Sequence, residues 1–149
     1  MAPAIDAAGS TPRISEMTAE DHKPRILIVE DHDALRALMA KFLGGAHPDY
    51  RIDEACNGRR AIELVKSHPP NLILMDIHLP DANGLELTAQ IRALHPAVQV
   101  IVVTQNDSTA HKAGASAAGA IGYVVKDKLF AELIPLVART LRTAAGSFA

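Results

Sequence analysis

The sequence has a single cysteine and no long apolar run, and both absences narrow the class of protein. Cys56 has no second cysteine with which to form an internal disulfide, as is typical of a reducing compartment. No stretch approaches the roughly 18 apolar residues that a membrane-spanning helix needs. The N-terminus lacks the basic segment and apolar core of a signal peptide. We therefore expect a cytoplasmic protein without membrane contacts, in which Cys56 is a small buried apolar residue.

A strong net charge is lacking as well. The 149 residues include 15 basic and 17 acidic ones, for a net charge of −2, and the basic residues are scattered along the chain. Such a balance gives no general attraction to nucleic acid or to anionic lipid. We expect no direct nucleic-acid binding by this chain, whose length suits one domain with a sizeable core.

The chain alternates short apolar runs with helical stretches. Residues 1–23 are rich in small and polar residues without apolar periodicity, which predicts a flexible N-terminal extension. Over residues 24–145, five strand and helix pairs follow at the spacing of βαβ units, and residues 146–149 form a tail. The pattern predicts a single α/β domain with a parallel sheet.

Three helices carry specific expectations. The first has an apolar stripe and should end at Gly44-Gly45; the stripe consists of Leu35, Leu38, Met39 and Phe42. The fourth, over residues 108–118, has an alanine face around Gly114, which buries little area and predicts the most weakly anchored helix. Pro135 inside the fifth helix predicts a kink or a later helix start.

Four polar residues directly follow four of the apolar runs: Asp31, Asp76, Thr104 and Lys126. In an open α/β sheet, residues just past the carboxyl ends of the strands reach the same edge crevice. We therefore expect carboxylates, a hydroxyl and an ammonium to converge there. Such a set is typical of a site that binds a metal ion and a phosphoryl group.

Glu30, next to Asp31, adds a third acid to this edge. Carboxylates about 4 Å apart repel one another by up to ~4 kcal/mol per pair at an effective dielectric constant of about 20. A hard divalent cation would relieve this repulsion, and oxygen ligands favour Mg²⁺. Lys126 and Thr104 suit the oxygens of a transferring phosphoryl group, and a carboxylate there can act as the nucleophile, giving an aspartyl phosphate.

These residues resemble the receiver domain of bacterial two-component response regulators. The resemblance covers about residues 24 to 145. Its motifs are Ile26–Asp31, Met75–Pro80 with Asn83-Gly84, Val103-Thr104 and Gly122–Asp127. The last segment is most similar to receivers that precede a helix-turn-helix DNA-binding domain. The resemblance implies a flavodoxin-like (βα)5 fold, a doubly wound parallel sheet with strand order 2-1-3-4-5.

The resemblance also implies a role for each metal and phosphoryl ligand. Asp76 would accept the phosphoryl group from a phosphohistidine on a sensor histidine kinase or phosphotransfer protein. Asp31 would bind Mg²⁺ directly, Glu30 directly or through water, and the backbone carbonyl of His78 would complete the protein ligands together with Asp76. Thr104 and Lys126 would hold the phosphoryl oxygens.

Thr104 and Tyr123 would be the switch residues that report phosphorylation. The signal would leave through the face built by the fourth helix, the fifth strand and the fifth helix, with a homodimer possible on phosphorylation. His78 and Gln105 would tune access to the site, because Gln105 stands where the family prefers a small residue. Asp127 replaces a proline common after the lysine, which removes the easy route to a cis peptide bond.

The function expected from these residues is phosphorylation-dependent signalling rather than enzymatic turnover, with self-catalysed phosphotransfer and autodephosphorylation only. The chain would be a stand-alone receiver or one excised from a DNA-binding regulator. One alternative is a degenerate receiver that acts only as a protein-binding module. The other is an aspartate-nucleophile phosphatase using Asp31-His32-Asp33, which would leave Asp76 unexplained.

Overall fold

A computed structural model describes residues 23–105 and 108–146 of the chain. The strands are β1 (Arg25–Val29), β2 (Arg51–Ala55), β3 (Leu72–Met75), β4 (Gln99–Thr104) and β5 (Gly122–Val125). The helices are α2 (Asp33–Ala46), α3 (Gly58–Ser67), α4 (Gly84–Leu94), α5 (Thr109–Ala117) and α6 (Leu129–Gly146), with a short 3₁₀ helix, η3 (Lys126–Lys128), before α6. Apart from Lys23 and Gly146, the predicted N-terminal extension and C-terminal tail lie outside the described residues.

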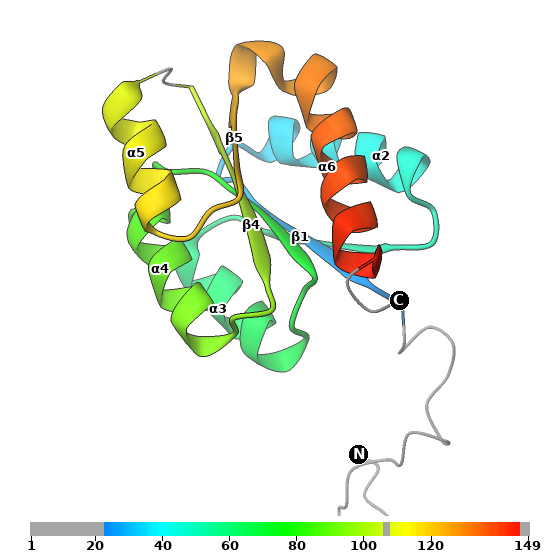
Figure 1. The fold of residues 1–149 in the computed structure, drawn as a ribbon, viewed down its shortest axis with the longest axis horizontal. Helices are drawn as coiled ribbons and strands as arrows, with labels where there is room; N and C mark the ends of the chain where they lie inside the picture. The colour runs from blue at the N-terminus through cyan, green and yellow to red at the C-terminus, as the bar shows by residue number, and fades with distance from the viewer. Residues whose placement is uncertain (1–22, 106–107, 147–149) are drawn as a thin grey trace, which may run out of the picture.

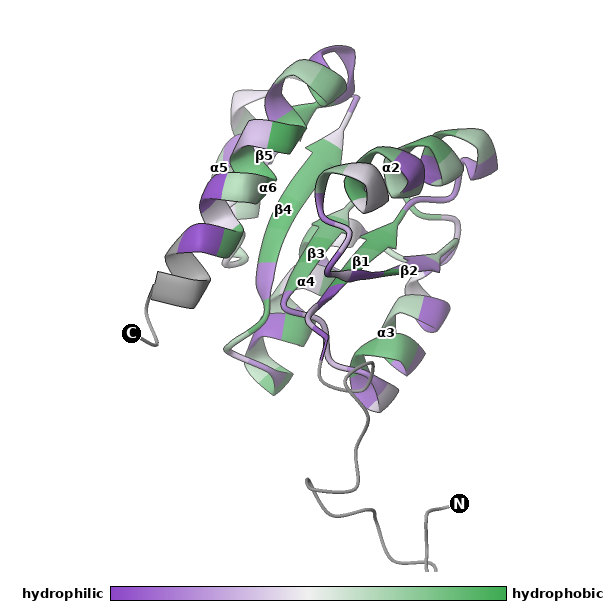
Figure 2. Ribbon diagram, turned by 90° about the vertical axis from the view of Figure 1, so that its right-hand side faces the viewer, coloured by the Kyte–Doolittle hydropathy of each residue, from purple (hydrophilic) through white to green (hydrophobic). Residues whose placement is uncertain are grey.

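The five strands form one parallel sheet in the order β2-β1-β3-β4-β5, which confirms the predicted topology. Helices α2 and α6 cover one face, and α3, α4 and α5 cover the other (Figure 1). Because helices cover both faces, the central strands are almost entirely apolar, and β1, β3 and β4 are largely green in Figure 2. Strand β2 lies at an edge of the sheet and carries more polar residues.

Side chains of β1 alternate between two hydrophobic cores. Ile26 and Ile28 pack in the core beneath α2 and α6, and Leu27 and Val29 pack in the core beneath α3 and α4. All four are buried, because successive residues of a strand point to opposite faces of the sheet. Strand β1 is thus fixed from both sides, and its end has a defined position.

Helix α2 differs from its predicted form. It continues through Gly44 and Gly45 to Ala46, and among the described residues only Gly119 has the positive φ that ends many helices at a glycine. The buried residues of α2 are Met39 and Leu43, whereas Leu38 and Phe42 are 42% and 47% exposed. The predicted stripe is therefore right for Leu35 and Met39, which pack in the core, and wrong for Leu38 and Phe42, because Leu43 lies nearer the sheet.

Helices α5 and α6 test the expectations of an alanine-rich face in the fourth helix and of a kink or a later start at Pro135 in the fifth. The only described residue of α5 that is fully buried is Ala115, in agreement with its alanine-rich face. Helix α6 runs without interruption past Pro135, so a later helix start is wrong. Pro135 lies on the exposed side, while Leu133 and Val137 are buried on the sheet and hold the helix on both sides of the proline. Within the described part of the chain, none of the helices has the length and apolar character to cross a membrane.

Candidate functional site

Glu30 and Asp76 lie side by side because β1 and β3 are paired in register. Val29 is opposite Met75, and the Asp76 N–H donates to the Val29 carbonyl at 3.0 Å. On the other side, the Glu30 N–H donates to the Ala55 carbonyl at 3.0 Å. The ladder therefore extends one residue past each strand and fixes both acidic residues at the carboxyl edge of the sheet.

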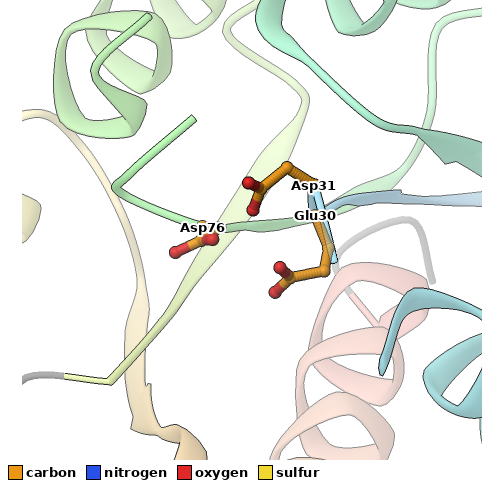
Figure 3. A group of neighbouring side chains, drawn as sticks. All are labelled: Glu30, Asp31 and Asp76. Carbon is orange, nitrogen blue, oxygen red and sulfur yellow. The ribbon is translucent and has the colours of Figure 1, made fainter. Parts of the chain in front are cut away.

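Asp31 completes a group of three carboxylates. One oxygen atom from each of Glu30, Asp31 and Asp76 lies within 4.8 Å of the others, and Figure 3 shows the three side chains gathered at the ends of their strands. Glu30 and Asp76 are 2% and 5% exposed, whereas Asp31 is exposed. Two of the acids are thus in a low-dielectric setting and the third faces water.

The acids line an open cavity of about 500 Å³. Its other lining residues are His32, Asp33, His78, Gln105 and Lys126. Gln105 and His78 are both exposed at this cavity, and the His78 N–H donates to Asp76 Oδ1 at 3.4 Å. The cavity therefore gives a small molecule or a partner side chain access to the Asp76 carboxylate.

Lys126 is the cation of the site. Its Nζ lies 2.8 Å from Glu30 Oε1 and 3.3 Å from Asp76 Oδ2. Burial raises the pKa of Glu30, an effect that the hydrogen bond from Lys126 offsets only in part. Burial alone would lower the pKa of Lys126, but its hydrogen bonds and its attraction to Glu30 and Asp76 outweigh burial and raise this pKa. The ammonium therefore stays charged at neutral pH.

The donor set fits a hard divalent cation. Three carboxylates supply oxygen ligands, and the exposure of Asp31 leaves room for the water ligands that Mg²⁺ retains. Within residues 23–105 and 108–146, this is the only group of three or more potential acidic, histidine or cysteine ligands. No histidine belongs to a group of this kind in this part of the chain.

Thr104 lies at the end of β4, opposite Val125, the residue before Lys126. It is fully buried and does not line the cavity, and its Oγ1 has no hydrogen-bond partner among the residues that the structure describes. A buried hydroxyl without a partner costs about 1–3 kcal/mol relative to a satisfied one. The site thus holds a hydroxyl that gains free energy if an acceptor comes within reach.

Tyr123 links the neighbourhood of the site to α5. Its partly buried ring packs against the cluster of Ile77, Val102 and Ala115, and Ile77 directly follows Asp76. Lys112 of α5 places its Nζ 5.9 Å from the centre of the ring. One small cluster therefore connects the loop after β3 with β4, β5 and α5 beside the site.

The loop from β3 to α4 is held against the site by close backbone contacts. The Gly84 N–H donates to the Ile77 carbonyl at 2.6 Å, and a Cβ at Gly84 would lie 2.0 Å from the Asp76 carbonyl oxygen. Asn83 caps α4 by accepting from two backbone N–H groups. Only glycine at position 84 allows α4 to start this close to Asp76.

Several predictions for single residues need correction or addition. Cys56 is exposed and not buried, because the chain leaves the edge strand β2 at Ala55, which is the buried residue there. The Lys126-Asp127 peptide bond is trans. Asp81 was not among the predicted residues, and it accepts from the Gly58 and Arg59 N–H groups at 2.7 and 2.9 Å. No local sequence pattern predicts this contact, since Asp81 lies more than twenty residues from both of its partners.

A five-stranded, doubly wound parallel sheet with three acids and a lysine at its carboxyl edge defines a class of small α/β signalling domains. The chain belongs to the response regulator receiver domain family, whose family model matches residues 26–138. Members of this family act in two-component systems as signalling domains rather than as classical enzymes.

The relatives are response regulators and transcriptional regulatory proteins. The chain is 32% identical over 108 residues to the transcriptional regulatory protein DegU of Brevibacillus brevis, covering 72% of this chain and 45% of DegU. It is 33% identical over 102 residues to the nitrate/nitrite response regulator protein NarL of Escherichia coli K12, covering 68% of this chain and 47% of NarL. The chain thus spans about half the length of the curated relatives it matches, and these relatives agree with the predicted subgroup.

Solved structures of receiver domains have the same fold as this chain. The signal receiver domain of a putative LuxO repressor protein from Vibrio parahaemolyticus has a TM-score of 0.76 at 30% identity, over 84% of this chain and 95% of that one. A LuxR-family DNA-binding response regulator from Staphylococcus aureus has a TM-score of 0.72 at 30% identity, over 78% of this chain and 98% of that one. The fold is that of CheY-like receivers.

Proposed function

We propose that Asp76 accepts a phosphoryl group from a phosphohistidine on a sensor histidine kinase or a phosphotransfer protein. In this step an Asp76 carboxylate oxygen attacks phosphorus, a P–O bond forms and the P–N bond of the phosphohistidine breaks. The electron pair leaves with the imidazole nitrogen, which takes a proton. The observation that carries the proposal is the position of Asp76, with the Lys126 ammonium 3.3 Å from one carboxylate oxygen and two further acids beside it.

In this proposal Glu30, Asp31 and Asp76, with the backbone carbonyl of His78, hold Mg²⁺. The ion supplies positive charge for the phosphoryl oxygens. Lys126 shifts its hydrogen bond from Glu30 toward a phosphoryl oxygen, which its charge stabilises. Autodephosphorylation is the only other chemistry of the site, with water reaching the aspartyl phosphate past His78 and Gln105, which line the cavity.

The signal leaves through the surface of α5, β5 and α6. The Thr104 hydroxyl, which has no hydrogen-bond partner within residues 23–105 and 108–146, would donate to a phosphoryl oxygen and draw the end of β4 toward the site. Tyr123, packed near Ala115 of α5, would then change position together with that helix. A switch needs an element with two arrangements of similar free energy, and α5 has few large contacts to lose.

The remaining features belong to the same proposal. The receiver extends over residues 24–145, acts in the cytoplasm, and forms a homodimer on phosphorylation if the α5, β5 and α6 surface is self-complementary. It works as a stand-alone receiver or as one part of a DNA-binding regulator, and its own surface does not bind nucleic acid. The relatives named above support the second arrangement, since they are about twice as long as the matched segment.

Phosphorylation with a small donor tests the proposal. Wild-type protein incubated with acetyl phosphate and Mg²⁺ should gain the mass of one phosphate by intact mass spectrometry, and Asp76→Asn should gain none. Asp33→Asn is the matched control, because Asp33 lines the same cavity without belonging to the three-acid group. Phosphate uptake by Asp76→Asn would contradict the assignment, and failure of the wild type to take up phosphate from any donor would favour a degenerate receiver.

A further inference from the structure

Arg36 has no role in the proposed chemistry, yet its guanidinium binds the turn that carries Glu30 and Asp31, two of the three acids. Its Nη1 donates to the Glu30 backbone carbonyl at 2.8 Å. Its Nη2 lies 2.8 Å from Asp33 Oδ1, and its Nε donates to Glu54 Oε1 at 3.1 Å. With the side chain only 16% exposed, one guanidinium ties the start of α2 and strand β2 to the residue before Asp31.

The Glu30 carbonyl needs this donor because the strand ladder ends beside it. The Glu30 N–H donates to Ala55, the last residue of β2, and the chain then turns into α3. Strand β2 therefore does not continue alongside the Glu30 carbonyl. A buried carbonyl left without a donor would be costly, and the Arg36 guanidinium supplies the missing hydrogen bond.

The carboxylate of Glu30 is held separately from its carbonyl. Glu30 Oε1 accepts from Lys126, and Oε2 accepts from the His32 N–H at 3.1 Å. His32 also caps α2 by accepting from the Leu35 N–H. The backbone direction from Glu30 to Asp31 thus depends on Arg36 on one side and on this helix cap on the other.

We propose that Arg36 is a positioning residue for the metal site, which sets the backbone of Glu30 and Asp31 so that both carboxylates face one cation. The inference rests on the proposed function, since it assigns the cation to these acids. Groups that orient metal ligands without touching the metal change its affinity by about 10–100-fold when they are replaced. Arg36 stands in that relation to Glu30 through the carbonyl hydrogen bond.

Charge and geometry predict opposite effects for a substitution at this position. Arg36 is a cation beside an acidic cluster, so the loss of its charge alone would strengthen Mg²⁺ binding by reducing repulsion. The loss of its hydrogen bonds would weaken Mg²⁺ binding by loosening the turn. Lysine separates the two effects, because it keeps the charge but lacks the planar fork that reaches Glu30, Asp33 and Glu54 together.

The test is the Mg²⁺ dissociation constant of the unphosphorylated protein, measured by calorimetric titration without any phosphodonor. Arg36→Met and Arg36→Lys should both raise this constant by about tenfold or more. Arg59→Met is the matched control, since Arg59 lines a pocket together with Arg36 and its side chain is 84% exposed. The control should keep the wild-type constant.

The following results would overturn the inference. Tighter binding by Arg36→Met with wild-type binding by Arg36→Lys would show an effect of charge alone and overturn the inference, as would equal binding by all four proteins. If circular dichroism shows that Arg36→Met does not fold, Arg36→Lys decides alone, and a wild-type constant there overturns the inference. If the wild type itself binds no Mg²⁺, the metal part of the proposed function fails, and the inference fails with it.

Discussion

Lys126 lies closer to Glu30 than to the proposed phosphoacceptor: its Nζ is 2.8 Å from Glu30 Oε1 and 3.3 Å from Asp76 Oδ2. The long side chain of Glu30 reaches the lysine across the strand ends. In the unphosphorylated protein the ammonium is therefore shared between two buried acids, and it is the principal compensation for their charge.

The first prediction concerns this pair. Lys126→Met should lower the free energy of unfolding at pH 8 by up to about 3 kcal/mol, because it leaves Glu30 and Asp76 buried without their cation. The loss should be smaller at pH 5. The native state raises the pKa of Glu30 above the ordinary 4.5, so it holds the proton more strongly than the unfolded chain does, and stability falls as the pH rises through this range.

Urea unfolding in the presence of EDTA at pH 5 and pH 8 measures this difference. Lys128→Met serves as the control, because Lys128 lies two residues away in η3 and is exposed. A loss in Lys126→Met that is equal at both pH values would show that Glu30 is not the group left uncompensated.

The second prediction compares two glycines. Gly84→Ala should destabilise the protein by about 1–3 kcal/mol, since its Cβ would lie 2.0 Å from the Asp76 carbonyl oxygen and α4 would have to move. Gly45→Ala should instead stabilise by roughly 0.5–1 kcal/mol, because Gly45 lies inside α2 with open space around it. Thermal and urea unfolding of both variants is the measurement, and destabilisation of similar size in both would contradict the role given to Gly84.

The third prediction concerns access to Asp76. Gln105 lines the cavity and is exposed, so its amide borders the path of a phosphodonor or an attacking water. Gln105→Ala should speed phosphorylation by acetyl phosphate, autodephosphorylation, or both, by several-fold. Time courses of intact mass and of the decay of the phosphorylated form measure the two rates, and Gln99→Ala, at the far end of β4, is the control. Unchanged rates in both directions would refute this role.

The fourth prediction concerns the output route. Phosphorylation should change amide hydrogen exchange mainly in α5 and β5, since Tyr123 packs there with Ile77 and Ala115. Tyr123→Ala should weaken that response while leaving phosphate uptake at Asp76 largely intact. Tyr50→Phe, a change at the other tyrosine beneath α2, is the control and should respond as the wild type does. A response concentrated in α2 and α3 instead would place the route elsewhere.

The chain's own pattern predicted a parallel sheet, and the resemblance to receivers supplied the strand order. Apolar runs alternating with helical stretches require a parallel sheet covered on both faces, and the receiver motifs implied the strand order that the structure has. The same logic placed Glu30, Asp31, Asp76 and Lys126 at one edge, since every parallel strand ends there. The parallel sheet and the shared edge follow from local periodicity and from the direction of the chain, and both can be read from neighbouring residues in the sequence.

Tertiary structure decided the contacts between segments that are distant in sequence. Periodicity does not fix how far a helix is rotated on the sheet, so α2 buries Met39 and Leu43 while Phe42 is half exposed. Nor does it show that Cys56 faces solvent where the edge strand ends. Lys126 lies nearer Glu30 than Asp76, and Arg36 donates to the Glu30 carbonyl. Both contacts would be lost if the atoms moved apart by a small fraction of their separation, and only the packing of the whole domain sets these distances.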